Sequence, residues 1–202
     1  MRLDWETLYR EFTAPATDGD CADLCRTGSR ARAACCGTER LSLIVFADEL
    51  AWARARTRCW RGRRPRTPAE AREVATWAEY AVLARCVRPR HCDRPYRSLT
   101  CRFFPLEPYF DPHEGFTALT YIYAAARICP LIRGQMDLRQ DFVNQSFAVW
   151  TQILTASPEE QSTYRRASRQ LRSRFARQGR TIRLFRPTAE FEAELTDTTG
   201  SC

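Results

Sequence analysis

The sequence contains no lysine, only two histidines and eight glycines, and no long apolar run. The scattered glycines form neither GxGxxG nor GxxxxGK(S/T), so the sequence contains no recognisable nucleotide- or S-adenosylmethionine-binding loop. The protease and hydrolase signatures HExxH and GxSxG are also missing. Asp48, Glu49 and Glu107 could act as general bases, but their spacing forms no paired dyad. These absences leave the cysteines as the main chemical signal in the chain.

Membrane-spanning and secreted classes are also disfavoured. The longest apolar run, Leu43–Ala47, is only a few residues long, and the richer stretch Phe116–Ile132 contains Arg127. Neither is suited to span a bilayer. The opening Met-Arg-Leu-Asp-Trp-Glu is not followed by an apolar core. We therefore expect no membrane span, no secretory signal and a cytoplasmic location.

The 202 residues (23.4 kDa) include 44% hydrophobic and 11% aromatic residues, which excludes disordered and collagen-like chains. Net charge is +8, and every basic residue is an arginine. Eight arginines lie in residues 54–72, and nine lie in residues 157–187 against two glutamates. Residues 188–202 carry four acids and no base. Basic blocks of this kind are most often solvated helix faces, but they also suit nucleic acid, acidic proteins or anionic lipid.

Apolar periodicity and capping signals predict a mainly α fold. The segments expected to be helical are residues 3–12, 47–58, 67–84, a segment that begins at Asp111, 142–153 and 157–179. Residues 13–40 and 85–110 read as loops, the second because it contains four prolines. The run Leu41–Phe46 fits either a strand or a buried turn.

The predicted architecture is a small irregular helical domain that is organised around cysteine-rich, metal-binding loops, with extra C-terminal helices. Residues 1–135 would form the metal-binding domain with its N-terminal helix. Residues 136–187 would form a helical extension that packs on it, and residues 188–202 an acidic mobile tail.

Nine of the ten cysteines lie between residues 21 and 129, and the tenth is Cys202. Disulfides, ordinary buried thiols and metal ligation are the three interpretations. A reducing compartment argues against disulfides. Packing as small hydrophobes suits one or two cysteines, such as Cys59, but not clusters in polar loops. Thiolates bind zinc or iron–sulfur centres, usually four to a site, and we favour this interpretation.

The spacing of the first cysteines adds detail. One helical turn would bring the thiols of Cys21 and Cys25 to one side. Cys35 and Cys36 are adjacent, so on an extended segment their side chains point apart and the two would serve a metal differently. Many arginines flank these loops, and nearby positive charge is expected to lower thiol pKa values and favour the thiolate.

The cysteine-rich segments resemble a known family. Cys21-x3-Cys25 precedes the vicinal pair Cys35-Cys36, an apolar run follows, and the string Cys101-Arg102-Phe103-Phe104-Pro105 comes later with Arg94-Pro95 before it and Cys129-Pro130 after it. This order over residues 21–132 is similar to the zinc- or iron-chelating cysteine-cluster proteins that are named for a CxxCxxCC signature. The resemblance implies a bound zinc or iron–sulfur centre. In some relatives, such as flagellin lysine methylases, it implies a part in protein modification.

The resemblance and the clustering together predict eight metal ligands. They are Cys21, Cys25, Cys35, Cys36, Cys86, Cys92, Cys101 and Cys129. Eight thiols suit two four-ligand sites, or one cluster with spare cysteines. His91 and His113 are weaker candidates, because the thiols already suffice.

The predicted function is therefore a metal-binding protein whose iron–sulfur or zinc centre has a redox or a protein- or peptide-modifying role. The alternative is an arginine-rich interaction module that binds nucleic acid or an acidic partner and in which the metal is purely structural. Basic and aromatic residues alternate in Arg102-Phe103-Phe104 and Arg183-Leu184-Phe185-Arg186, as in some single-strand binders.

Overall fold

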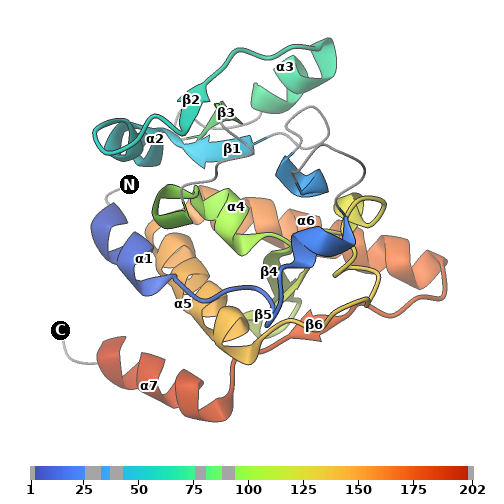
Figure 1. The fold of residues 1–202 in the computed structure, drawn as a ribbon. Helices are drawn as coiled ribbons and strands as arrows, with labels where there is room; N and C mark the ends of the chain where they lie inside the picture. Colours follow the sequence, from blue (N-terminus) through green and yellow to red (C-terminus); the bar gives the residue numbers. More distant parts are fainter. Residues whose placement is uncertain (1–2, 26–32, 37–42, 76–80, 88–93, 200–202) are drawn as a thin grey trace.

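The computed structural model describes residues 3–25, 33–36, 43–75, 81–87 and 94–199. The chain folds into a mixed α/β structure, so the prediction of a mainly α fold is wrong. Two three-stranded antiparallel sheets, in the orders β1-β3-β2 and β4-β5-β6, pack with helices (Figure 1). Apart from the β4–β5 hairpin, these strands pair with segments distant in the sequence, and local periodicity does not encode such pairing.

The element boundaries are as follows. The α-helices are α1 (Trp5–Glu11), α2 (Ala47–Arg54), α3 (Pro68–Val74), α4 (Leu99–Phe103), α5 (Gln140–Ala156), α6 (Pro158–Arg177) and α7 (Ala189–Thr199). The 3-10 helices are η1 (Cys21–Leu24), η2 (Ala34–Cys36), η3 (Arg94–Tyr96) and η4 (Tyr123–Ala125). The strands are β1 (Leu43–Phe46), β2 (Trp60–Gly62), β3 (Ala81–Cys86), β4 (Leu106–Asp111), β5 (Gly115–Tyr121) and β6 (Leu184–Phe185).

Three predicted helices are confirmed, each with its local signal, and the helix predicted over residues 47–58 is present as the shorter α2. The Asp4 carboxylate accepts the Thr7 amide at 3.2 Å at the start of α1. The Ser157 hydroxyl accepts the Glu160 amide at 3.2 Å at the start of α6, and Gly179 follows its end at φ +60°. A side chain in this left-handed conformation would be strained, which is why glycine suits the position. Helix α5 buries the apolar stripe that predicted it.

The helix predicted over residues 67–84 begins correctly but is shorter. The Thr67 hydroxyl accepts the Glu70 amide at 3.1 Å, as the capping signal indicates. Helix α3 ends at Val74, and residues 81–84, predicted to be helical, lie in β3. Because β3 is the central strand and pairs with both β1 and β2, its tertiary hydrogen bonds outweigh the helical pattern.

The helix predicted from Asp111 is wrong, since this segment is the β4–β5 hairpin. The Asp111 carboxylate accepts the amides of His113 and Glu114 at 2.8 and 3.2 Å, which makes a turn instead of a helix cap. Gly115 then adopts φ +86°. The last four residues of β5 are all buried, so the strand lacks the alternation that would have revealed it.

The predicted loop over residues 85–110 contains α4 and most of β4. Pro108 lies within β4 opposite Leu119. Because β4 is an edge strand, one side of its backbone needs no hydrogen-bonded neighbour, and the missing N–H of proline is tolerated there.

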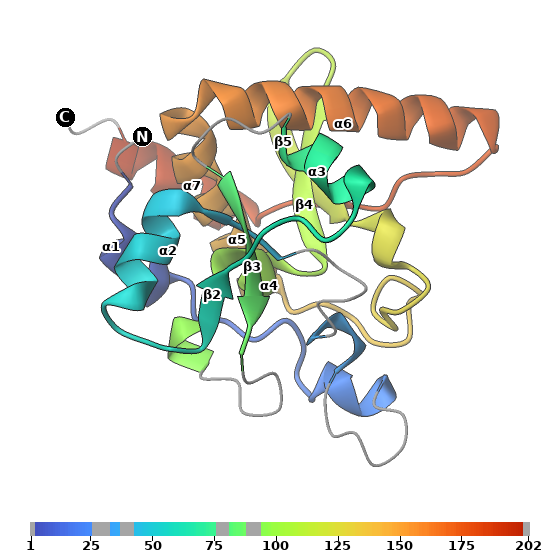
Figure 2. The same ribbon diagram turned by 90° about the horizontal axis from the view of Figure 1, so that it is seen from above.

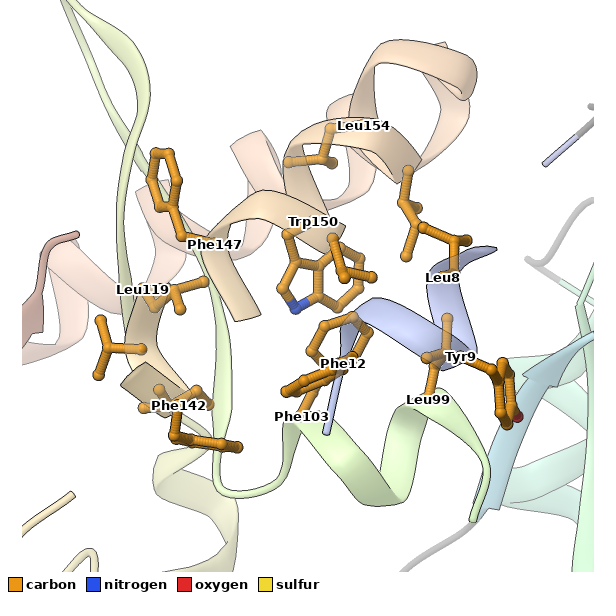
Figure 3. Close-up of a cluster of buried hydrophobic side chains, with 14 of the residues drawn as sticks. Leu8, Tyr9, Phe12, Leu99, Phe103, Leu119, Phe142, Phe147, Trp150 and Leu154 are labelled. Atoms are coloured by element: carbon orange, nitrogen blue, oxygen red, sulfur yellow. The ribbon is translucent and has the colours of Figure 1, made fainter. Parts of the chain in front are cut away.

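Helices α5 and α6 flank the second sheet, and Figure 2 shows the long helix α6 running across β4 and β5. The main core lies between this sheet, α1, α4 and α5 (Figure 3). Phe103 stacks on Trp150 with ring centroids 4.5 Å apart, and Phe12 lies 5.1 Å from Phe103. Side chains from both sides of residue 135, the predicted domain boundary, belong to this core. The division into domains stays a prediction.

The segment expected to form an acidic tail includes helix α7, in which Glu190 and Glu192 are exposed. Within the described segments, no helix combines the length and apolar character that crossing a bilayer requires.

Glu49 is fully buried where α1, α2 and α4 meet. Its carboxylate accepts the Tyr9 hydroxyl at 2.6 Å and the Leu99 amide at 2.8 Å. Burial raises the pKa of Glu49, and these donors only partly oppose the effect. Glu49 thus joins three helices and is not available to water as a general base.

We predict that Glu49 makes stability depend on pH. Because its folded-state pKa is raised, its favourable contribution is complete below the ordinary value of 4.5 and is lost as pH rises through the raised pKa. The free energy of unfolding should therefore fall over this window, by at most about 1.4 kcal/mol per pH unit. Glu49→Gln should remove this dependence, as measured by urea unfolding at several pH values. The exposed Glu114→Gln should keep the wild-type profile, and parallel profiles for wild type and Glu49→Gln would refute the assignment.

Candidate metal centre

Five of the predicted metal ligands line a single cavity of about 400 Å³. They are Cys21, Cys25, Cys35, Cys101 and Cys129. They come from η1 and its end, η2, α4 and the turn after η4, so the sequence separation within the group exceeds one hundred residues. Aromatic and apolar side chains complete the wall, and Phe12 and Phe142 belong both to it and to the main core. The cavity is therefore built on the rigid part of the fold.

Short local structures hold these cysteines in position. The Asp20 carboxylate accepts the Ala22 amide at 3.0 Å and starts η1, and Cys25 ends that helix through a 3.1 Å bond to the Ala22 carbonyl. The Ser98 hydroxyl accepts the Cys101 amide at 3.4 Å at the start of α4. The Cys129 amide donates to the Ala125 carbonyl at 3.0 Å. The backbone at Cys21, Cys25, Cys101 and Cys129 is therefore part of a hydrogen-bonded turn or helix end.

Backbone amides point at two of the sulfur atoms. The Ala34 amide donates to the Cys25 sulfur at 3.4 Å. The amides of Leu131 and Ile132 donate to the Cys129 sulfur and lower its pKa, although burial raises the pKa by more. Donors of this kind stabilise the thiolate, which is the form that binds a metal.

Three of these thiols, those of Cys21, Cys35 and Cys129, have raised pKa values. Burial and the neighbouring sulfurs of Cys129 and Cys25 raise the pKa of Cys21. A hydrogen bond with Cys36, followed by burial, raises the pKa of Cys35. The expected lowering by flanking arginines is therefore wrong for Cys21, Cys35 and Cys129, and Arg97 only weakly opposes the shift at Cys21. A bound cation would reverse this balance, because a coordinating thiol is deprotonated.

The remaining predicted ligands lie elsewhere or cannot be located. Cys36 lies beside Cys35 but does not line the cavity. Cys86 is on β3 opposite Trp60, also outside the cavity lining. Cys92 and the secondary candidate His91 fall outside the described residues, as does Cys202.

The other secondary candidates do not join the cavity. Cys59 packs against the small core beside the first sheet, and His113 lies in the β4–β5 turn. Glu107, on β4 opposite Thr120, has its pKa raised by burial to about 7 but does not line the cavity. Over the described residues, the cavity wall contains neither a carboxylate nor an imidazole.

The five thiols surround the cavity and do not converge on one point. In the described part of the chain, no group of three or more His, Cys, Asp or Glu side chains is arranged to hold a single ion. A tetrahedral zinc site, with Zn–S bonds of about 2.3 Å, needs its sulfurs much closer together than ligands spread around a cavity. The donor set is nevertheless of one chemical kind and suits a sulfur-ligated centre.

Arg102 is the functional residue that sequence reasoning missed. Its guanidinium donates to the carbonyls of Tyr9 at 2.9 Å, Pro95 at 2.7 Å and Arg97 at 3.0 Å, and also to that of Phe12. It lies 4.5 Å from the Tyr9 ring centroid. Arg102 thus connects the end of α1 to the segment before α4, two parts of the cavity wall. The only signal for this role was its place in the Cys-Arg-Phe-Phe-Pro string.

Comparison of the chain with protein-family models, with curated proteins and with solved structures finds no match. The resemblance to cysteine-cluster proteins therefore stays a prediction from the motif residues.

We predict that Arg102→Ala lowers the free energy of unfolding by about 2–4 kcal/mol, because four carbonyls lose a charged donor. Arg102→Lys should recover only part of this loss, since an ammonium group cannot reproduce the planar fork. Urea unfolding measures both effects. Arg58→Ala, on an exposed turn, should change stability by no more than about 0.5 kcal/mol. Equal stabilities of the Arg102 and Arg58 variants would contradict this role.

Proposed function

We propose that this protein binds an iron–sulfur cluster through the cysteines that line the cavity. The single observation that carries the proposal is that five thiols, from four separate segments, border one cavity. Thiolates are the ligands of such clusters, usually four to a cluster. Cys36, Cys86 and Cys92 remain predicted ligands: the first two do not line the cavity, and Cys92 falls outside the described residues.

The state of the cysteines supports a metal over disulfide bonds. Among the described residues, no disulfide involves Cys21, Cys25, Cys35, Cys101 or Cys129. Disulfides are rare in reducing compartments, so the proposal places the protein in the cytoplasm. Simple packing is a poor alternative, because a buried structural cysteine needs neither amide donors at its sulfur nor four thiol neighbours.

The size of the site favours a cluster over a single zinc ion. A cluster holds its thiolates around several iron atoms, so its ligand sulfurs are farther apart than those around one ion. Thiols arranged around a cavity fit the first geometry better than the second. The amides aimed at Cys25 and Cys129 are also of the type that tunes cluster potentials.

The reaction that such a centre would serve is proposed from the resemblance alone. Some relatives of the cysteine-cluster type take part in protein modification, so a protein or peptide is the proposed substrate, with a redox role for the centre. No carboxylate or histidine in the described part of the cavity wall offers acid–base chemistry, which leaves the sulfur-bound centre to carry any reaction.

Air-free purification followed by iron, zinc and acid-labile sulfide analysis tests the proposal. A brown protein with visible charge-transfer absorption and matching iron and sulfide is expected. If the protein is colourless and contains stoichiometric zinc, the bound metal is zinc and not an iron–sulfur cluster. A protein with neither metal would end the proposal.

Single substitutions test the ligand assignment. We predict that Cys25→Ser or Cys129→Ser removes most of the bound metal, because each deletes a sulfur at the cavity. Cys59→Ser is the matched control, since Cys59 lies in the small core and should leave the metal content unchanged. Metal retained in both cavity variants, or lost equally in the control, would contradict the assignment.

A further inference from the structure

Helix α6 has two faces of opposite character. Its buried face, formed by Ser168, Leu171 and Phe175, packs toward β4. The rest of its circumference carries arginines, namely Arg165, Arg166, Arg169, Arg172, Arg174 and Arg177. After Glu159 and Glu160 in the first turn, no acid occurs until Glu190, beyond the helix. The outer face is thus of one sign along most of the helix.

Three of these arginines are fully available to a partner. Arg166, Arg169 and Arg177 are exposed, and within the described structure no hydrogen bond, ion pair or ring contact involves their side chains. At 100° and 1.5 Å per residue they share an arc of roughly 80° and span roughly 16 Å. They therefore lie along one side of α6, as a line of free guanidinium groups.

The neighbouring arginines are held in position by aromatic rings. The Arg165 guanidinium lies 4.8 Å from the Phe110 ring centroid. Arg172 lies 5.6 Å from the Tyr109 centroid and donates to the Phe110 carbonyl at 2.5 Å. These contacts hold Arg165 and Arg172 against β4, beside the three exposed arginines.

This arrangement opposes the stability of the isolated protein. Arg165 and Arg169 are four residues apart, and Arg166 and Arg169 are three apart, so their charges repel along the helix. No carboxylate in the described segments forms an ion pair with the free line. A polyanion that lies along α6 would relieve the repulsion.

We propose that the outer face of α6 binds the phosphate backbone of nucleic acid without sequence specificity. Forked guanidinium groups match phosphate oxygens, and the line is long enough for successive phosphates. A membrane fits less well, because the large apolar residues of α6 face the core and leave nothing to insert into lipid. An acidic protein also fits less well, since the face lacks the apolar anchors at the centre of most protein interfaces.

The test measures binding of the purified full chain to a fluorescent DNA duplex of arbitrary sequence at several salt concentrations. The variant is Arg166→Gln/Arg169→Gln/Arg177→Gln. Glutamine is close to arginine in helix propensity, and circular dichroism checks that α6 persists. Because each phosphate contact contributes about 0.9 to the slope of log affinity against log salt, the variant's slope should be shallower by about 2.7. At about 0.1 M salt the loss of affinity should be on the order of 100-fold.

The matched control is Arg58→Gln/Arg61→Gln/Arg64→Gln, which makes the same change in net charge on another exposed surface. It should keep most of the affinity and the slope. An equal loss in both triple variants, or no salt-dependent binding by wild type, overturns the proposal. Tighter α6-dependent binding to anionic vesicles or to polyglutamate also overturns it. None of these outcomes depends on metal content, so the metal centre is tested separately.

Discussion

The core and the cavity both depend on one junction between three side chains from distant parts of the chain, Tyr9, Glu49 and Arg102. The Tyr9 hydroxyl donates to buried Glu49, while the Arg102 guanidinium lies on the Tyr9 ring. Glu49 also accepts the first amide of α4, the helix that carries Cys101 to the cavity. Because Glu49 is fully buried and Arg102 is half-buried, both side chains require their hydrogen-bond partners in place. The junction therefore fixes α1 and α4 relative to one another.

The candidate metal centre shows how a rigid scaffold supports irregular segments. Four of its cysteines lie on short 3-10 helices or turns, and Cys101 lies on α4 itself. The short segments lie against α1, α4 and α5, whose aromatic side chains supply the cavity's inner wall. Coordination would add bonds between segments that the core alone does not connect, and metal binding would then contribute to folding.

The two proposed activities use separate parts of the molecule. Apolar residues of α6 cover the second sheet, whereas Arg166, Arg169 and Arg177 are exposed on the helix surface. The cavity lies beside α1 and α4, and no residue of α6 lines it. The two proposed sites share no side chain, so occupancy of one would leave the residues of the other unchanged.

Local signals in the sequence determined α1, α5 and α6, because caps such as Asp4 and Ser157 and an unbroken apolar stripe act within a few residues. They also identified the cysteines as the chemical feature. Only the tertiary structure decided that residues 81–84 and 115–121 are strands. Residues 81–84 pair with a remote strand, β1, and β5 pairs both with its hairpin neighbour β4 and with the remote β6, and this pairing outweighs local preference. The tertiary structure also decided which thiols share a cavity, and it placed Arg102 where its hydrogen bonds connect parts of the cavity wall. Proximity between residues about a hundred positions apart depends on the whole fold.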